Sequence, residues 1–409
     1  MSIIKPFKAL RPQAQFAKQV ASKPYDVLTS AEAKIEAQGN PNSFLHVTKS
    51  EIDLPENIDS HSKVVYEKAK ENLDAFFKRD ILFSENKECF YIYRLVMNDK
   101  TQTGLVAVSS VDDYENNIIK KHELTRPDKE QDRIDHMKTT GAQTGNVFLA
   151  YRNNATIDSI IENWTSKKNA VYNFVADDNV THTLWIVNDD KIIKQIQEIF
   201  ESEISCTYIA DGHHRAASAA KVRQSLKNKT KAADYFLTTL FPSSQLQILD
   251  YNRVIKTLNG LSEKDFLKAL ETDFIVTEES SAYKPQQPHT FGLYISNQWY
   301  KLIAKEGTYT QDPIGVLDIT ILQNNILSKY LNIQDQRTDK NIDFVGGIRG
   351  LSALENKVNN GEFVMAFSLY PVSIEQLFDI ADSGNVMPPK STWFEPKLRD
   401  GLVTHLINE

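Results

Sequence analysis

The sequence is poor in cysteine and has no long apolar run. Its 409 residues include two cysteines, Cys89 and Cys206, which lie far apart and outside any metal-ligand spacing. This usage indicates reduced, buried thiols and predicts a cytoplasmic protein. No apolar stretch is long enough to cross a bilayer, and residues 1–7 lack the apolar core of a secretory signal. We therefore expect neither a membrane partner nor export.

The chain also lacks the positive charge that is typical of nucleic-acid-binding proteins. It has 47 lysines and arginines against 54 aspartates and glutamates, a formal net charge of −7. Because no helix-turn-helix pattern is evident either, we expect no nucleic-acid partner. A hydrophobic content of 41% is enough for a large core, and the length predicts two or three structural units. No pattern in the sequence determines the oligomeric state.

What the chain does have is a turn sequence within residues 206–220. A short apolar run ends there and an alanine-rich segment follows. The five residues between them are Asp211, Gly212, His213, His214 and Arg215. This order predicts a strand, a tight turn and a helix, because Gly212 tolerates positive φ and Asp211 is a favourable N-cap residue.

The start of such a helix is suited to an anion. Unpaired N–H groups and the positive end of the helix dipole would lie beside two imidazoles and a guanidinium, a combination that favours phosphate. The alternative is that His213 and His214 only fill a capped turn. We favour anion binding, because the two histidines and Arg215 follow Asp-Gly without a gap.

Residues 211–215 resemble the Asp-Gly-His-(His/Thr)-Arg box of the DUF1015 family, and this resemblance extends over nearly the whole chain. The turn is also similar to the nucleotide-phosphate turn of the ParB/sulfiredoxin superfamily, which includes free-serine kinases. The resemblance implies an α/β (α+β) fold with mixed sheets. It places a ParB/sulfiredoxin-like nucleotide-binding core in residues 1–240 and an additional C-terminal α+β portion, whose tail returns to the site, in residues 241–409. A strand–helix–strand rhythm in residues 146–220 independently favours an α/β layered unit.

A second group of polar residues lies at 122–126, His-Glu-Leu-Thr-Arg. It can be no more than a solvated strand end, but it matches the His-Glu-x-Thr motif of DUF1015. A glutamate near a phosphate turn can take the proton of a substrate hydroxyl or help to hold Mg²⁺, and both roles stay open for Glu123. No second histidine stands at the helical offset that zinc requires, so we do not expect zinc.

Two N-terminal segments, residues 11–27 and 40–46, also match DUF1015 motifs. By themselves, residues 40–46 predict only a turn that leads into a strand. The resemblance implies that Tyr25, Asp26 and His46 face the site and contact the substrate.

Two further positions are candidates for substrate binding. His182 belongs to a His-x-Leu-Trp pattern of the family, although a core histidine bonded to the backbone is an equally good interpretation. Arg253 matches the arginine of the family's His-Arg pair, in which Asn252 replaces the histidine. This replacement removes an acid–base group and leaves Arg253 as a contact for phosphate or carboxylate.

Residues 386–398 resemble the Met-Pro-x-Lys-Ser-Thr-x-Phe-x-Pro-Lys motif of DUF1015. Three prolines exclude an ordinary helix, and the segment is rich in groups that donate hydrogen bonds to phosphate. These donors are Lys390, Ser391, Thr392 and Lys397. A solvated loop is the alternative, but we expect the segment to fold back over the Asp211 turn.

The similarity to serine kinases implies a phosphotransferase that acts on a small hydroxyl amino acid, serine or phosphoserine, with ADP or ATP and Mg²⁺. The reaction can also run towards dephosphorylation of phosphoserine. The candidate catalytic residues are Glu123, Asp211 and His213, with Glu123 also the candidate metal ligand. The candidate phosphate ligands are Gly212, His214, Arg215, Thr125, Arg126 and the four donors of the tail.

The alternative function is a nucleotide-binding regulatory switch without kinase activity. Redox chemistry of the sulfiredoxin kind is less favoured, because His213 stands where that family has its cysteine.

Overall fold

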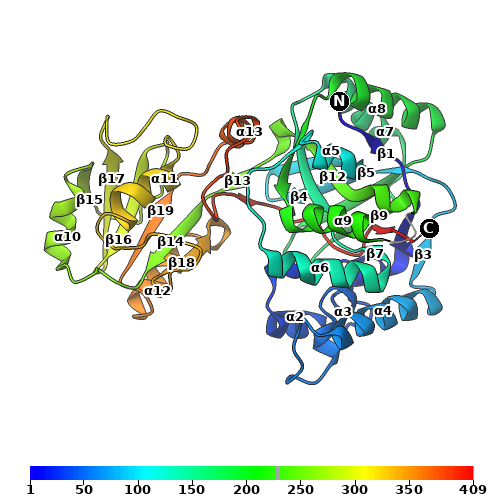
Figure 1. The fold of residues 1–409 in the computed structure, drawn as a ribbon, viewed down its shortest axis with the longest axis horizontal. Helices are drawn as coiled ribbons and strands as arrows, with labels where there is room; N and C mark the ends of the chain where they lie inside the picture. The colour runs from blue at the N-terminus through cyan, green and yellow to red at the C-terminus, as the bar shows by residue number, and fades with distance from the viewer. Residues whose placement is uncertain (227–229, 409) are drawn as a thin grey trace. The chain divides into compact units, whose positions relative to one another are not determined.

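The computed structural model describes residues 1–226 and 230–408, which form two compact units (Figure 1). Unit 1 comprises Met1–Leu246 and Pro396–Glu409, and unit 2 comprises Gln247–Glu395. Both units combine helices with β-sheets, which confirms the predicted mixed α/β class. The ParB/sulfiredoxin relationship and domains divided at residue 240 stay predictions. None of the helices described here is long and apolar enough to cross a membrane.

The main sheet of unit 1 contains nine described strands in the order β6-β11-β8-β12-β5-β4-β10-β9, with β1 paired to β5. Its strands are β1 (Ile4–Lys5), β4 (Phe90–Met97), β5 (Lys100–Ser110), β6 (Ile119–Lys120), β8 (Val147–Tyr151), β9 (Tyr172–Val175), β10 (Thr181–Val187), β11 (Thr207–Asp211) and β12 (Tyr235–Pro242). The expected antiparallel hairpin within residues 90–108 is β4 and β5. Strands β6 and β11 are parallel, whereas β8 is antiparallel to β11.

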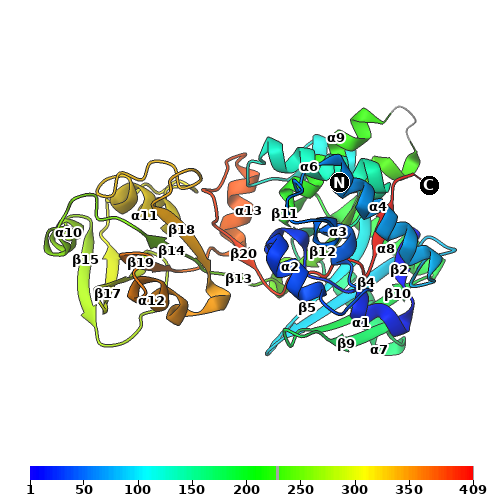
Figure 2. The same ribbon diagram turned by 90° about the horizontal axis from the view of Figure 1, so that it is seen from below.

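Helices pack on this sheet through apolar side chains at helical spacing. They are α5 (Val111–Glu115), α6 (Pro127–Thr140), α7 (Ala155–Lys167), α8 (Asp190–Glu203) and α9 (His213–Ser225). In α8, Ile193, Ile196 and Phe200 recur on one face and are buried in the core with Tyr151 of β8. Helices α6 and α9 lie side by side (Figure 2), and the Ser218 hydroxyl donates to a carbonyl of α6.

A smaller sheet of unit 1 has the order β3-β2-β21-β7. It is built from β2 (Ala9–Pro12), β3 (Leu82–Ser84), β7 (Ala142–Gln143) and β21 (Thr404–Leu406), and beside it in the sequence are α1 (Ala17–Val20), α2 (Ser30–Ala37), α3 (Leu45–Thr48) and α4 (Lys63–Lys78). Because β21 comes from the end of the chain, the last residues complete unit 1. Helix α2 has the predicted capping box of Thr29 and Glu32.

The prediction that the turn in residues 40–46 leads into a strand is wrong. Residues 40–43 form a turn, but α3 follows it, with the Thr48 N–H bonded to the Phe44 carbonyl. Phe44, Leu45 and Val47 are all buried, a pattern that a helix can satisfy and an alternating strand cannot.

The sheet of unit 2 has the antiparallel order β15-β17-β16-β19-β14-β18, and β13 pairs separately with β20. The strands are β13 (Ile248–Leu249), β14 (Tyr251–Ile255), β15 (Phe274–Glu279), β16 (Thr290–Ile295), β17 (Gln298–Ala304), β18 (Ile342–Gly346), β19 (Met365–Leu369) and β20 (Trp393–Phe394). The helices are α10 (Glu263–Leu270), α11 (Asp318–Leu322), α12 (Leu351–Asn359) and α13 (Ile374–Asp382). The sequence of residues 312–331 predicts a helix, but α11 begins only at Asp318. The Asp312 carboxylate accepts the N–H groups of Ile314 and Gly315 and holds a turn before it.

Short irregular helices connect these elements. They are η1 (Ala14–Phe16), η2 (Tyr25–Val27), η3 (Ser50–Asp53), η4 (Lys231–Asp234), η5 (Ser243–Gln245), η7 (Gly347–Arg349) and the π-helical turn η6 (Gln323–Leu327).

Phe200→Ala should destabilise unit 1 by about 3–5 kcal/mol, because it removes a fully buried ring from the core beneath β8. Hydrogen exchange should show the loss as faster exchange of the β8 and β12 amides, with β16 of unit 2 as internal reference. Glu201→Ala, on the exposed side of the same helix, is the matched control and should change stability by less than about 0.5 kcal/mol. Equal loss of protection in the two variants would contradict the assigned core.

Candidate functional site

The site lies where β6 and β11 end. Because the two strands are parallel neighbours, their carboxyl ends meet at one edge of the sheet. The loop 121–126 leaves β6 there, and Asp211 and Gly212 follow β11. Strand β8 is antiparallel to β11, so its first residues lie at the same edge. The fold therefore brings the two predicted motifs, 122–126 and 211–215, together.

Gly212 forms the turn. Its φ of 98° lies in the left-handed region, which residues with a side chain rarely adopt. A Cβ at this position would also stand only 3.3 Å from the Val147 Cα, so both backbone conformation and space disfavour a side chain. The prediction of positive φ is confirmed. The predicted N-cap is wrong: Gly212, not Asp211, is the N-cap residue of α9, and no side chain caps the helix. Asp211 is the last residue of β11, and its carboxylate is directed to Lys397 instead.

Asp211 and Lys397 form an ion pair in which Nζ lies 2.9 Å from Oδ2. Burial alone would raise the pKa of Asp211, but the positive charges of Lys397 and then Arg215 outweigh burial and hold that pKa well below its usual range. Asp211 is therefore a permanent anion at neutral pH. A carboxylate of such low basicity is a poor general base and a good electrostatic anchor.

His213 is buried and neutral. Its Nε2 accepts the backbone N–H of His122 at 3.5 Å, and its Nδ1 lies 3.8 Å from a carboxylate oxygen of Glu123. Since Nε2 accepts, we assign the proton of the neutral ring to Nδ1. Burial, reinforced by His122, keeps the pKa of His213 well below its usual value. His213 thus presents an N–H to Glu123 without carrying a charge.

His122 packs edge-to-face on His213, with ring centroids 4.5 Å apart. Burial lowers the pKa of His122 to about 4, so it too is neutral, and its Nδ1 is buried without a hydrogen-bond partner. The two adjacent imidazoles contribute packing and dipoles to the site, not positive charge.

His214 holds the other end of the loop. Its Nε2 accepts the backbone N–H of Arg126 at 3.0 Å, and burial lowers its pKa. The Thr125 hydroxyl donates to the Glu130 carboxylate, and the Arg126 guanidinium pairs with Asp128 at 2.8 Å. Together His213 and His214 pin the loop onto the first turn of α9, and Thr125 and Arg126 are engaged within their own segment.

Arg215 is a buried cation. Its two terminal nitrogens donate to Asp26 and to the carbonyl of Asn146, both at 2.6 Å, whereas Nε has no hydrogen-bond partner. Burial opposes the charge, but Asp26 and then Asp211 overcome it and raise the pKa of Arg215 further. Predicted residues Asp26, Asp211 and Arg215 thus meet in one charged group.

Tyr25 lies between two guanidinium groups. The Arg133 ζ carbon stands 3.9 Å from the centre of its ring, and that of Arg215 stands 5.5 Å away. Burial, followed by the charge of Asp26, raises the pKa of Tyr25 to about 12. A cavity of about 30 Å³, lined by Tyr25 and both arginines, lies here, large enough for a water molecule or a small polar group.

Asp400 also belongs to this region, although the sequence did not single it out. It is buried, one of its carboxylate oxygens has no hydrogen-bond partner, and burial raises its pKa to about 7 against the opposing charge of Arg215. Arg133, a cation that follows residues 122–126 in the sequence, also belongs to this region. No local pattern marks Asp400, because its neighbours come from distant segments.

His46 and His182 have recorded partners outside the turn. The ring nitrogens of His46 lie 2.8 Å from Asp53 and 3.1 Å from the Asn40 carbonyl. In His182, Nε2 accepts from Arg399 Nε at 3.4 Å, and Nδ1 lies 2.7 Å from the Tyr93 hydroxyl. These bonds give both histidines a structural role, and their proposed contact with substrate stays a prediction.

Four predicted residues belong to unit 2 and are described there: Arg253, Lys390, Ser391 and Thr392. A terminal nitrogen of Arg253 donates to the Lys390 carbonyl at 3.0 Å. Lys397 is the tail residue that belongs to unit 1 and contacts the Asp211 turn. Among described residues, no group of three or more His, Cys, Asp or Glu side chains is arranged to hold a metal by itself.

Lys397→Met should lower the free energy of unfolding of unit 1 by about 1.5–3 kcal/mol at neutral pH, the size of a charge-assisted hydrogen bond. Because folding lowers the pKa of Asp211, the pair stabilises fully above the ordinary Asp pKa of about 3.9, and this contribution is lost as the pH falls towards the folded-state value. Urea unfolding at several pH values measures the difference.

The control for this prediction is Lys63→Met, which breaks the solvent-exposed pair of Lys63 and Glu67. It should leave the free energy of unfolding almost unchanged at every pH, because solvent screens an exposed pair. A Lys397→Met effect as small as this one would show that the Asp211 pair does not stabilise the turn.

No curated protein sequence matches the chain significantly. Among solved structures, a conserved hypothetical protein from Pyrococcus furiosus is 15% identical, with 74% of this chain and 95% of that chain covered and a TM-score of 0.37. A free serine kinase variant in complex with AMP is 13% identical, with 73% and 92% covered and a TM-score of 0.38.

SbnI with a C-terminal truncation, from Staphylococcus aureus, is 8% identical, with 73% and 86% covered and a TM-score of 0.39. Likenesses at this level carry no functional argument. The family is shown by another comparison. Residues 4–320 match the model of DUF1015, which is described as a protein of unknown function. This match spans well over half of the sequence, and the chain belongs to the DUF1015 family.

Proposed function

We propose that unit 1 is a phosphotransferase that uses an adenine nucleotide, ADP or ATP, and acts on a small hydroxyl amino acid, serine or phosphoserine. The observation that carries this proposal is the start of α9, where no side chain caps the helix and Lys397 and Arg215 add two positive charges. Helix dipole, backbone N–H groups and both cations favour the same kind of ligand, a phosphate. The resemblance of residues 211–215 to the turn of serine kinases supports the nucleotide.

Some residues at the turn supply positive charge, and others hold the neighbouring loop in place. His213 and His214 are neutral, so they hold the loop 122–126 in place and leave the positive charge to Lys397 and Arg215. Asp211 keeps Lys397 at the turn, ready to contact a phosphate oxygen. Because phosphoryl transfer depends on positioning and charge neutralisation, such a rigid and cationic turn suits the reaction.

Glu123 is the better candidate for the base. Asp211 is too weak a base, whereas the Glu123 carboxylate is 43% exposed and faces the Nδ1–H of His213. Its exposure allows it to reach a substrate hydroxyl. Mg²⁺ fits the same place, since it binds through one or two carboxylates together with phosphate oxygens, and it would supply charge neutralisation. Glu123 is the carboxylate that would hold it.

The acceptor would lie at the Arg215 end of the site. Arg133 and Arg215 line the cavity there with Tyr25, and both cations suit the carboxylate of an amino acid. Asp26, which is half exposed beside Arg215, suits its ammonium group. A regulatory switch would bind the nucleotide at the same turn without needing an acceptor, so acceptor dependence separates the two functions.

Arg215→Gln should weaken ADP affinity by about 10- to 100-fold, because a charged hydrogen bond of about 1.5–3 kcal/mol is lost. Calorimetry on variants with an unchanged circular dichroism spectrum measures this. Arg223→Ala is the matched control: Arg223 lies at the other end of α9, where it pairs with Asp112 and Glu115, and its loss should leave ADP affinity unchanged. Unaltered affinity of Arg215→Gln would remove the phosphate turn.

Glu123→Gln should abolish turnover while nucleotide affinity is kept within about tenfold, because glutamine preserves the shape but neither accepts a proton nor carries charge. Phosphorus NMR of protein, Mg²⁺, adenine nucleotide and serine, or phosphoserine, follows the reaction. Glu115→Gln is the control and should remain active, because Glu115 lies in α5 and pairs with Arg223 at the far end of α9. Nucleotide binding by the wild type with no serine- or phosphoserine-dependent signal would favour the regulatory switch.

A further inference from the structure

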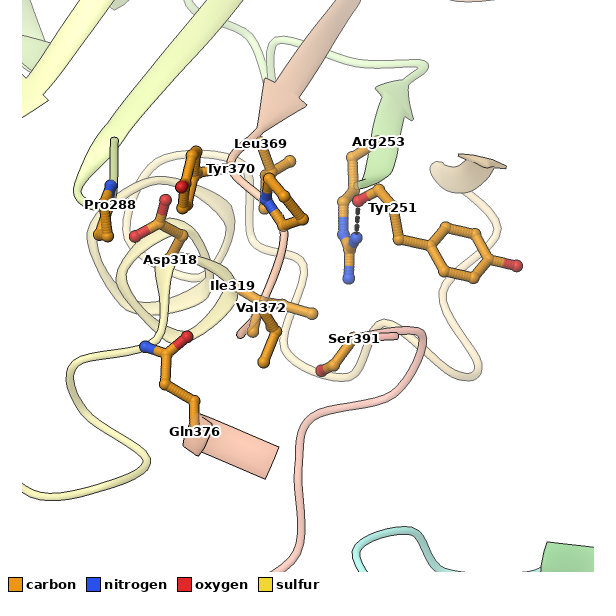
Figure 3. A pocket seen from close by; sticks show the side chains of 11 residues that line it. Tyr251, Arg253, Pro288, Asp318, Ile319, Leu369, Tyr370, Val372, Gln376 and Ser391 are labelled. Atoms are coloured by element: carbon orange, nitrogen blue, oxygen red, sulfur yellow. Dashed lines mark hydrogen bonds between the residues drawn. The ribbon is translucent and has the colours of Figure 1, made fainter. Parts of the chain in front are cut away.

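Unit 2 contains a polar pocket made wholly of its own residues (Figure 3). It has about 20 Å³ of space for the centres of water-sized groups, which limits a ligand to a few heavy atoms and is far too little for a nucleotide. Arg253 and Asp318 supply its charged groups. In the view of Figure 3 they lie on opposite sides, and the apolar side chains of Ile319, Leu369 and Val372 lie between them.

Arg253 is a cation without a counter-charge. It is fully buried on β14, and within the described chain its guanidinium forms no ion pair. It donates to neutral oxygens, those of Gln336 at 3.1 Å, Lys390 at 3.0 Å and Pro389 at 3.3 Å, and to the Tyr251 carbonyl. Burial lowers its pKa to about 9, a sign that its charge is poorly compensated. An anion in the pocket would supply the missing charge.

Asp318 is a carboxyl group with one unused oxygen. It begins α11 and is 8% exposed. One oxygen accepts the backbone N–H of His289 at 2.7 Å, and the other is buried near the backbone of Tyr370 and forms no well-aligned hydrogen bond with a described residue. The His289 ring is engaged elsewhere, with Tyr309 at 2.9 Å and the Val316 carbonyl at 3.1 Å, so it does not satisfy this oxygen. Burial raises the pKa of Asp318 to about 7.

Two opposite charges that served only the fold would pair with each other, and the described structure records no such ion pair. We propose that this pocket binds a small amino acid, whose carboxylate lies at Arg253 and whose ammonium group lies at Asp318. The apolar side chains between Arg253 and Asp318 suit the α-carbon that joins the ammonium and carboxylate groups of the ligand, together with its short side chain. This site consists of unit 2 residues alone and does not depend on the proposed phosphoryl transfer.

The hydrogen bonds from Arg253 to uncharged oxygens connect the pocket with the tail. The guanidinium that would bind the carboxylate also holds the carbonyls of Pro389 and Lys390, and Ser391 lines the same pocket. An amino acid bound there would contact the segment that the sequence marked as a phosphate-binding motif. The ordering of residues 388–391 is therefore expected to respond to the ligand.

The test uses the full chain and calorimetry with L-alanine and glycine, which lack a hydroxyl and are not phosphoryl acceptors. A pH above about 7 keeps Asp318 ionised. Propionate and ethylamine, each with one of the two charges, should bind at least about tenfold more weakly than L-alanine, since each loses one charged contact. This comparison probes the Arg253 end without mutating a residue that also holds the tail.

Asp318→Asn should weaken L-alanine binding by at least about tenfold and should not unfold the protein, because it removes a buried charge and keeps the shape. Asp343→Asn, on the exposed surface of β18, is the charge-matched control and should bind normally. Arg215→Gln removes the carboxylate contact proposed for unit 1, so the L-alanine binding that persists in this variant belongs to the pocket of unit 2.

Three results would overturn the proposal. Absence of L-alanine and glycine binding would leave Arg253 as a structural tether of the tail. Equal binding of propionate and L-alanine would exclude the role of Asp318. Binding that is lost in Arg215→Gln and kept in Asp318→Asn would assign the amino acid to unit 1.

Discussion

Arg215 is a cation with 8% of its surface exposed, and the segments around it are arranged so that its charge is compensated. Burying an ion without partners costs several kcal/mol, which explains why three separate parts of the chain converge on this guanidinium. Asp26 arrives from η2, the Asn146 carbonyl from the start of β8, and Asp211 from the end of β11. The tail contributes Lys397, which in turn compensates Asp211.

This arrangement changes how the two histidines of the turn are interpreted. Adjacent histidines beside an arginine first indicate a positively charged anion site. In the structure burial lowers the pKa of both rings and keeps them neutral, and the Nε2 of each ring accepts a backbone N–H of the loop after β6. The rings join the two loops at the edge of the sheet, and the charges that attract a ligand come from Lys397 and Arg215.

Chain order and spatial order differ most in the C-terminal residues. After unit 2 the chain returns to unit 1, where β21 pairs with β2 and β7, and Lys397 and Asp400 join the charged group around Arg215. Unit 2 is thus an insertion between the main part of unit 1 and its last residues. Arg253 and Asp318, the buried charged groups of unit 2, differ from Arg215, because the described residues of this unit give them no counter-charge.

The sequence by itself determined the local features of this protein. The capping box of α2, the hairpin of β4 and β5, the start of α6 at Pro127 and the positive φ of Gly212 follow from short-range sterics and hydrogen bonding, which a few neighbouring residues dictate. The residues of the turn themselves predicted Arg215 as an anion contact, and motif resemblance added Asp26 and Glu123 to the candidate site. Only the tertiary structure decided which charges meet: Asp26 reaches Arg215 across 189 residues and Lys397 reaches Asp211 across 186. It also decided that Asp211 pairs instead of capping, that the histidines are neutral and that Asp400 is buried near Arg215, because pKa values and pairings depend on burial and distance, which no periodicity in the sequence records.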